Sequence, residues 1–160
     1  MPASCTFTLN RRSTSTLVCA GFGSVTAFSG NGRHINSPDS TNVANAGAIP
    51  KGMYYIVDRE SGGHLGWLWD GVKDLGADTH RAEWFALYRD DGAIDDWTLI
   101  DGVRRSNFRL HPVGRYGESD GCITLSSREQ FKALRSYLKT QPPAFIPGTV
   151  TRYYGTVEVR

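Results

Sequence analysis

The chain consists of short runs of β-branched and aromatic residues separated by turns rich in Gly, Asn and Asp. Runs of this kind, in which apolar and polar positions alternate, are typical of strands with one buried face. Because they recur along the whole chain, the pattern predicts a mainly β, α+β fold. The predicted strands are Cys5–Leu9, Thr16–Cys19, Ser24–Phe28, Met53–Asp58, Trp84–Arg89, Trp97–Ile100 and Tyr153–Val159.

One region of this pattern has two interpretations. Asp90, Asp91 and Gly92 lie between two predicted strands and favour a hairpin turn that joins them. Residues 79–89 can also be written as a helix that begins at Thr79. The sequence leaves both open.

A helix is predicted over residues 127–139. Ser126 or Ser127 can cap its first turn, and a Glu or Gln follows three positions later, as in a capping box. Two consecutive prolines after residue 141 end it. The apolar positions that recur at helical spacing are Phe131, Leu134 and Leu138.

A long polar stretch, Ser29–Pro50, follows neither the helical nor the strand period. A loop of this length in a compact domain is commonly functional. We therefore treat Ser29–Pro50 as a candidate loop on the substrate side of a functional site.

The composition fits one packed domain spanning residues 1–160. Hydrophobic residues make up 39% of the chain and charged residues 21%, which excludes a disordered, collagen-like or coiled-coil protein. The net charge is only +2 and the charges are mixed, so nothing favours nucleic acid as a partner. No apolar run approaches the roughly 18 residues that a membrane span needs.

The first twenty residues lack the pattern of a secretion signal. Arg11 and Arg12 are followed by an apolar run only from Leu17 to Ala20, which is too short for the hydrophobic region of a Sec signal peptide. We therefore expect a protein made in the cytoplasm without a Sec signal.

Neither cysteines nor histidines are spaced as metal ligands. Cys5, Cys19 and Cys122 are odd in number, so at least one thiol stays unpaired within the monomer. The histidines other than His111 have no neighbours at metal-binding spacing. We predict no metal and no cofactor.

The candidate chemistry lies in the segment FRLHPVGRYGESDGCITL. Apolar Phe108 and Leu110 alternate with Arg109 and His111, so His111 is predicted near a strand end, facing away from the apolar side chains. A glycine-rich turn then returns the chain to Cys122 and a second short apolar strand. The imidazole and the thiol can therefore meet.

A cysteine beside a histidine can act as a nucleophile. A free thiol, with a pKa of about 8.5, is mostly protonated at neutral pH, and an imidazole can take its proton. His111 would be this base and Cys122 the nucleophile. Gly121 permits a sharp turn, so the amides of Gly121 and Cys122 can point at a developing oxyanion, while Ser119 can hydrogen-bond within the loop. Taken alone, such a pair is more often structural than catalytic.

The order of these residues resembles a known family. His111-Pro112 followed by SDGCITL at Ser119–Leu125 is similar to the His and S-x-G-C motif of YkuD-like L,D-transpeptidases, and more closely to type VI secretion L,D-transpeptidase effectors. The upstream segments FSGNG and AIPKGMYY resemble the S-G-N and I-P-x-G-x-Y segments of these effectors. The resemblance implies a β-sandwich-like L,D-transpeptidase catalytic fold with one or two short helices.

The resemblance also implies roles for individual residues. His111 corresponds to the general base, Cys122 to the nucleophile and Ser119 to a supporting loop residue. No separate third carboxylate matches, so we expect a backbone carbonyl to orient the imidazole, with Asp120 as the second choice.

Two positions depart from the YkuD-like pattern. Asp120 stands where those enzymes have His, and Thr124 stands just past the cysteine, where they have Arg or Asn. We therefore expect a different substrate groove, with Arg109, Asp120 and Thr124 as substrate-binding residues.

The implied reaction is acyl transfer at the diaminopimelate–D-Ala bond of peptidoglycan tetrapeptide stems. Water or a D-amino acid then resolves the thioester, which gives L,D-carboxypeptidase or L,D-transpeptidase activity with D-amino acid exchange. The resemblance further implies an antibacterial effector that a type VI secretion apparatus delivers to the target-cell periplasm, where a cognate immunity protein would oppose it.

Two alternatives remain. An NlpC-like cysteine amidase or endopeptidase would use the same nucleophile, but there the cysteine precedes the histidine in the chain, and here it follows. A non-catalytic module that binds peptidoglycan or a partner protein would need neither His111 nor Cys122.

Overall fold

The computed structural model describes residues 1–59, 83–114 and 119–160. In these ranges the chain is mostly β with one α-helix, as the sequence predicts. The strands form a closed barrel, in the order β1-β12-β4-β5-β8-β9-β3-β2, so the sandwich-like arrangement is not confirmed. The barrel strands are β1 (Ala3–Phe7), β2 (Ser15–Cys19), β3 (Gly23–Phe28), β4 (Gly52–Asp58), β5 (Phe85–Arg89), β8 (Arg109–Pro112), β9 (Ile123–Leu125) and β12 (Gly155–Val159).

Alternating burial along the strands fills the barrel with apolar side chains. In β2, for example, every second residue is buried, as expected for a strand with one face toward the core. The barrel closes where the first strand pairs in parallel with the last, from Ala3 beside Gly155 to Phe7 beside Val159. Large side chains that are completely or almost completely buried in this core include Phe7, Leu17, Tyr54, Ile56, Phe85, Leu110 and Ile123.

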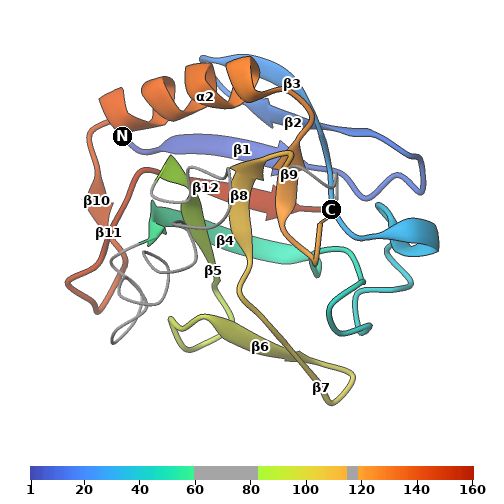
Figure 1. Cartoon of the computed structure of the whole chain (residues 1–160). Coiled ribbons are helices and arrows are strands. Elements are labelled where there is room, and N and C mark those ends of the chain that lie inside the picture. The colour runs from blue at the N-terminus through green and yellow to red at the C-terminus, as the bar shows by residue number, and fades with distance from the viewer. Residues whose placement is uncertain (60–82, 115–118) are drawn as a thin grey trace, which may run out of the picture.

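In the described ranges, two small sheets, one α-helix and one short 3₁₀ turn lie outside the barrel. Helix α2 (Arg128–Thr140) crosses the barrel at the top of Figure 1, and the hairpin of β6 (Trp97–Ile100) and β7 (Val103–Ser106) projects at the bottom. The second small sheet pairs β10 (Ala144–Phe145) with β11 (Arg152–Tyr153). Over the described residues, no helix is both long enough and apolar enough to cross a membrane.

The predicted helix is confirmed with its cap and its apolar face. The hydroxyl of Ser127 accepts a hydrogen bond from the Gln130 backbone N–H at 3.2 Å, which satisfies a donor of the first turn. Phe131, Leu134 and Leu138 are the buried residues of α2. They cover one end of the core beside β8 and β9.

The predicted hairpin turn at residues 90–92 is wrong. β5 pairs with β4 and β8, whereas β6 pairs with β7, so Asp90, Asp91 and Gly92 connect strands of different sheets. Both edges of β5 are already occupied within the barrel, and no edge is left for β6. The helical interpretation of 79–89 is also wrong for 85–89, which form β5; residues 79–82 lie outside the described ranges.

A disulfide joins the first two strands. Cys5 and Cys19 are direct cross-strand partners and form the bond, while Cys122 is free. The expectation that at least one thiol stays unpaired is confirmed. Both disulfide cysteines are buried in the core, so the bond links β1 to β2 inside the barrel.

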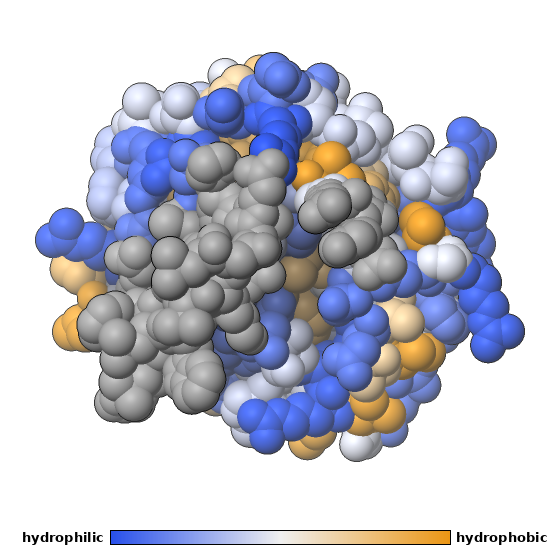
Figure 2. Space-filling view, viewed as in Figure 1, coloured by the Kyte–Doolittle hydropathy of each residue, from blue (hydrophilic) through white to orange (hydrophobic). Residues whose placement is uncertain are grey.

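On the surface, Figure 2 shows hydrophilic side chains over most of the viewed face, with hydrophobic ones in small separate patches.

Candidate active site

The parallel pairing of β8 with β9 brings the predicted base and nucleophile to one face of the barrel wall. Leu110 pairs with Ile123, and both belong to the core. Because side chains alternate along a strand, the next pair, His111 and Thr124, faces the opposite way. Cys122 comes two residues before Thr124 and directly precedes β9.

The imidazole of His111 is held from three sides. Its Nδ1 lies 2.7 Å from the carbonyl oxygen of Pro112, and since a carbonyl only accepts, Nδ1 carries the hydrogen. Nε2 is then an acceptor in the neutral ring and takes a hydrogen bond from the Thr124 hydroxyl at 3.3 Å. The ring stacks on the indole of Trp84 with centroids 4.2 Å apart. A backbone carbonyl thus orients the imidazole, which is the first of the two expected arrangements.

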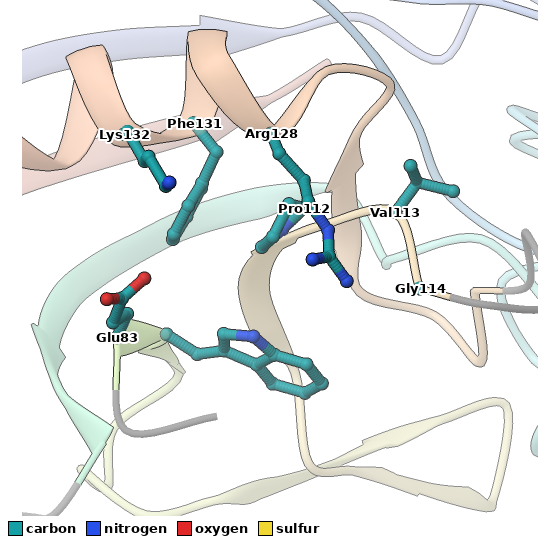
Figure 3. A pocket seen from close by; sticks show the side chains of 8 residues that line it. Glu83, Pro112, Val113, Gly114, Arg128, Phe131 and Lys132 are labelled. Carbon is teal, nitrogen blue, oxygen red and sulfur yellow. The ribbon is translucent and has the colours of Figure 1, made fainter. Parts of the chain in front are cut away.

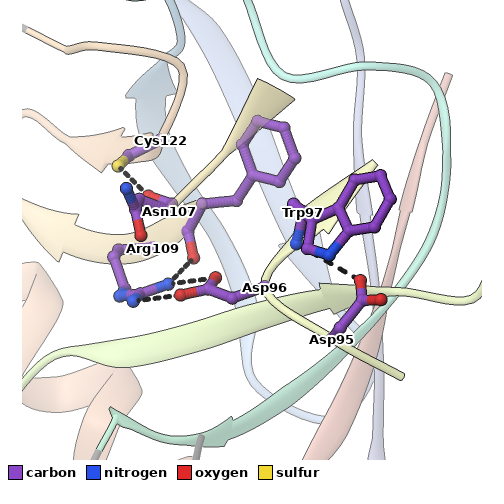
Figure 4. A network of polar contacts seen from close by, with 7 residues as sticks. Asp95, Asp96, Trp97, Asn107, Arg109 and Cys122 are labelled. Carbon is purple, nitrogen blue, oxygen red and sulfur yellow. Dashed lines mark hydrogen bonds and ion pairs between the residues drawn. The ribbon is translucent and has the colours of Figure 1, made fainter. Parts of the chain in front are cut away.

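The thiol of Cys122 is protonated at rest. Its Sγ donates to the carbonyl oxygen of Asn107 at 3.6 Å (Figure 4). Burial raises the pKa of Cys122 to about 11, although the backbone N–H and the charge of Arg109 act in the opposite direction. At neutral pH the thiol therefore needs a base, and its hydrogen has to turn away from Asn107 before an imidazole can accept it.

The loop before Cys122 is fixed by an asparagine that the sequence analysis did not single out. Asn31 accepts a hydrogen bond from the Ser119 backbone N–H at 2.7 Å and donates to the Asp120 carboxylate at 2.9 Å. The Ser119 hydroxyl in turn donates to the carbonyl oxygen of Cys122 at 2.9 Å. Ser119 is therefore a supporting loop residue in its geometry, and Asn31 of the S-G-N segment is the residue that holds it.

Arg105 is a buried arginine that packs directly behind the nucleophile. It is only 2% exposed and donates to the carbonyl oxygens of Thr41, Gly47 and Ala48. Burial lowers its pKa. A Cβ at Gly121 would lie 2.3 Å from the Arg105 guanidinium, and Gly121 has a φ of +104°, so both space and backbone conformation require glycine there.

The long loop 29–50 serves the site mainly as a scaffold. The Ser29 hydroxyl accepts from the Ile49 backbone N–H at 2.8 Å, and the Asn36 side chain accepts from the Ser29 N–H at 2.9 Å. The first of these bonds ties the two ends of the loop together, and the second holds its middle to its start. The loop carries a short 3₁₀ turn, η1 (Gly32–His34). Ala44 and Asn45 of this loop line the cavity described next, and its place on the substrate side stays a prediction.

A polar cavity of about 380 Å³ opens beside Cys122. Its described wall residues include the predicted site residues Arg109, Asp120 and Cys122 but not Thr124, which is completely buried. Thr124 thus lies behind the imidazole. Among the described residues, the arginines that line the cavity are Arg59, Arg104, Arg105 and Arg109, a concentration of positive charge that suits a ligand with carboxylates.

Arg109 already has a carboxylate partner. Its two terminal nitrogens bind both oxygens of Asp96 at 2.7 Å (Figure 4), and one of them also donates to the carbonyl oxygen of Phe108 at 2.9 Å. Such a bidentate pair occupies the fork of the guanidinium. The sequence assigns Arg109 to substrate binding, whereas the structure shows its donors engaged within the protein.

A second, smaller cavity of about 70 Å³ lies on the α2 side of Trp84. Figure 3 shows Arg128, Phe131 and Lys132 of α2 on the side of this cavity opposite Glu83. Trp84 belongs to the walls of both cavities. In the described ranges, no group of three or more His, Cys, Asp or Glu side chains is arranged to hold a metal ion.

Comparison with known proteins gives one match. A family model described as the Tlde1 domain matches residues 23–149. This range contains every residue of the site described above. No curated protein and no solved structure matches the chain.

Proposed function

Because the chain belongs to the Tlde1 domain family of type VI secretion L,D-transpeptidase effectors, we propose that it is a peptidoglycan-acting enzyme with Cys122 as nucleophile and His111 as base. The single observation that supports the proposal is the paired register of β8 and β9: it sets His111, oriented by a backbone carbonyl, against Thr124, two residues after Cys122, whose free thiol lines an arginine-rich cavity. Nucleophilic catalysis by cysteine needs a thiol, a base and an orienting group for the base.

The chemistry follows from these positions. The Thr124 hydroxyl gives up its hydrogen bond to Nε2 of His111, Nε2 takes the thiol proton with the lone pair that this frees, and Sγ of Cys122 attacks the carbonyl carbon of the scissile bond. The amides of Gly121 and Cys122 stabilise the oxyanion of the tetrahedral intermediate. When the intermediate collapses, the C–N bond breaks and the imidazolium gives its proton to the leaving amine, so that a thioester remains on Cys122.

The substrate we propose is the tetrapeptide stem of peptidoglycan, cleaved between diaminopimelate and D-Ala. Water resolves the thioester to a tripeptide, which is L,D-carboxypeptidase activity, and the amine of a D-amino acid resolves it by exchange. Stem peptides carry several carboxylates, and the cavity wall presents arginines beside Cys122, which supports this substrate class.

The biological role we propose is that of an antibacterial toxin. A type VI apparatus would deliver the enzyme to the periplasm of a neighbouring cell, where its substrate lies, and a cognate periplasmic immunity protein would inhibit it. Family membership supports this role.

Mass spectrometry of tetrapeptide muropeptides tests the reaction. Wild type is expected to release D-Ala and, with added D-amino acid, to form the exchanged product, whereas Cys122→Ala is expected to form neither. The matched control is Cys5→Ala/Cys19→Ala, which removes the other two sulfurs and should keep the products. Cleavage at another bond of the stem would indicate an NlpC-like enzyme, and equal behaviour of wild type and Cys122→Ala would indicate a binding module.

A further inference from the structure

The four arginines among the described residues of the cavity wall are not equivalent. Arg109 is held by both oxygens of Asp96, and Arg105 is buried and donates to three backbone carbonyls. The guanidinium groups of Arg105 and Arg109 position parts of the site, and few of their N–H donors remain available to a ligand. The Arg59 guanidinium lies over the Trp84 ring, 5.2 Å from its centroid.

Arg104 differs from Arg105 and Arg109 in exposure and in partner. It stands on β7, is exposed to solvent, and lines the cavity. Its guanidinium lies 4.9 Å from the centroid of the Trp97 ring on the neighbouring strand β6. Within the described part of the chain, no carboxylate forms an ion pair with Arg104.

The contact with Trp97 leaves Arg104 ready to bind an anion. A guanidinium that lies over an aromatic ring is attracted by the π face of the ring, and its N–H donors remain able to bind an anion. The contact also restricts the long side chain before a ligand arrives, which reduces the entropy lost on binding. A planar carboxylate matches this donor edge in bidentate geometry.

We propose that Arg104 is the specificity-determining residue that receives a carboxylate of the peptide substrate. The inference rests on the proposed function and deepens it, because it states which chemical group of the peptide is read and by which side chain. The sequence pattern favours Arg109 for this task. The structure assigns it to Arg104 because Asp96 already occupies the Arg109 fork.

The test uses a stem tetrapeptide and a set of analogues in which each free carboxylate is converted in turn to an amide. Wild type is expected to lose about tenfold to hundredfold in kcat/KM on one amide, the loss of a charge-assisted hydrogen-bonded pair. Arg104→Gln should lose a similar factor on the parent peptide, mostly in KM, and should lose nothing further on that amide. Arg104→Lys, which keeps the charge without the fork, should fall between them.

Arg152→Gln is the matched control. Arg152 also lies over an exposed aromatic ring in a two-stranded sheet, 5.4 Å from the Phe145 centroid, but it is not among the residues that line the cavity. It should retain wild-type kcat/KM on every peptide. The inference is overturned if Arg104→Gln keeps wild-type efficiency, or if it still discriminates every amide as wild type does. A wild type that cleaves none of the peptides would instead overturn the proposed function.

Discussion

The guanidinium of Arg105 fills the space that a side chain at position 121 would need. Nothing in the sequence relates the two residues. Arg105 follows another arginine, Arg104, whereas Gly121 directly precedes the predicted nucleophile, Cys122. In the structure they form one support, because Arg105 also binds three carbonyls of the loop 29–50.

Gly121→Ala is therefore expected to abolish measurable activity and to lower the melting temperature. Two costs add: a positive φ for a residue with a side chain, of order 1–3 kcal/mol, and a contact with Arg105 that a Cβ cannot make without displacing it. Gly92→Ala separates them, because Gly92 has a similar φ of +100° with nothing within 4 Å. Equal losses of stability in the two variants would contradict the role of Arg105.

Asn31→Ala is expected to reduce kcat about tenfold to hundredfold, since it frees the loop that positions the nucleophile. The change leaves the Ser119 N–H and the Asp120 carboxylate without their Asn31 partner. Steady-state kinetics on stem peptides measures the effect. Asn10→Ala is the control, because the Asn10 side chain also accepts from one backbone N–H, that of Arg12, and donates to a second group, here the Thr14 carbonyl, in an exposed turn. A kcat that falls equally in both variants would refute a specific effect on the catalytic loop.

The thiol should be unreactive toward iodoacetamide near neutral pH in the free enzyme, and its alkylation rate should rise as the pH approaches about 11, the pKa of Cys122. A rate that is already constant near pH 7 would mean that a thiolate and an imidazolium coexist at rest. Alkylation is followed by mass spectrometry.

Protein stability should depend on the same group. The folded pKa of about 11 lies above the ordinary value of a cysteine thiol, so the unfolded chain loses this proton first. The contribution of Cys122 is then present below about pH 9 and is lost as the pH rises toward 11. Urea unfolding should show that wild type loses more free energy of unfolding over this interval than Cys122→Ala. Parallel curves for the two proteins would contradict the raised pKa.

Thr124→Val is expected to reduce kcat/KM about twofold to tenfold, the effect of one neutral hydrogen bond, with little change in stability. The hydroxyl donates to Nε2 of the neutral imidazole and can accept from the imidazolium, so its loss should also move the acidic limb of the pH–rate profile. Thr124→Ser keeps the hydroxyl and should keep both properties. If kcat/KM falls equally in Thr124→Val and Thr124→Ser, the effect comes from packing and not from the hydroxyl group.

Reduction of the Cys5–Cys19 disulfide, whose cysteines are separated by 14 positions, is expected to cost about 3 kcal/mol of stability. For a domain of this size that corresponds to a fall in melting temperature of roughly 6–12 °C. Calorimetry with and without reductant measures it, and Cys5→Ala/Cys19→Ala should reproduce the reduced value. Activity at 25 °C should survive, since neither cysteine lines the cavity. An unchanged melting temperature would show that the bond does not constrain the unfolded chain.

Local pattern was sufficient for the elements that depend on neighbours in the chain. Helix α2 has the predicted cap and the predicted apolar face. In β8, His111 faces away from Leu110, as the alternation of side chains along a strand predicts. The sequence also predicted that β8, which carries His111, lies beside β9, which directly follows Cys122, because few residues connect the two strands.

Interactions between distant segments were beyond such patterns. The partner of Arg109 is Asp96, which lies before another strand, and nothing in the spacing distinguishes it from the other acidic residues nearby. The prediction of a hairpin at 90–92 was wrong for the same reason. β5 pairs with β8, a strand further along the chain, because packing across the barrel determines which strand lies beside it. The side chain of Asn31 forms hydrogen bonds with Ser119 and Asp120, which lie 88 and 89 positions later in the chain.

The pairing of β1 with β12 has a consequence for the order of events in folding. The first strand finds its parallel partner in β12, residues 155–159, so the barrel cannot close before this segment has left the ribosome. Contacts between such distant segments make folding slow. Until β12 is in place, β8 and β9 belong to an open sheet, and the barrel around the site is completed in a single step rather than by stages.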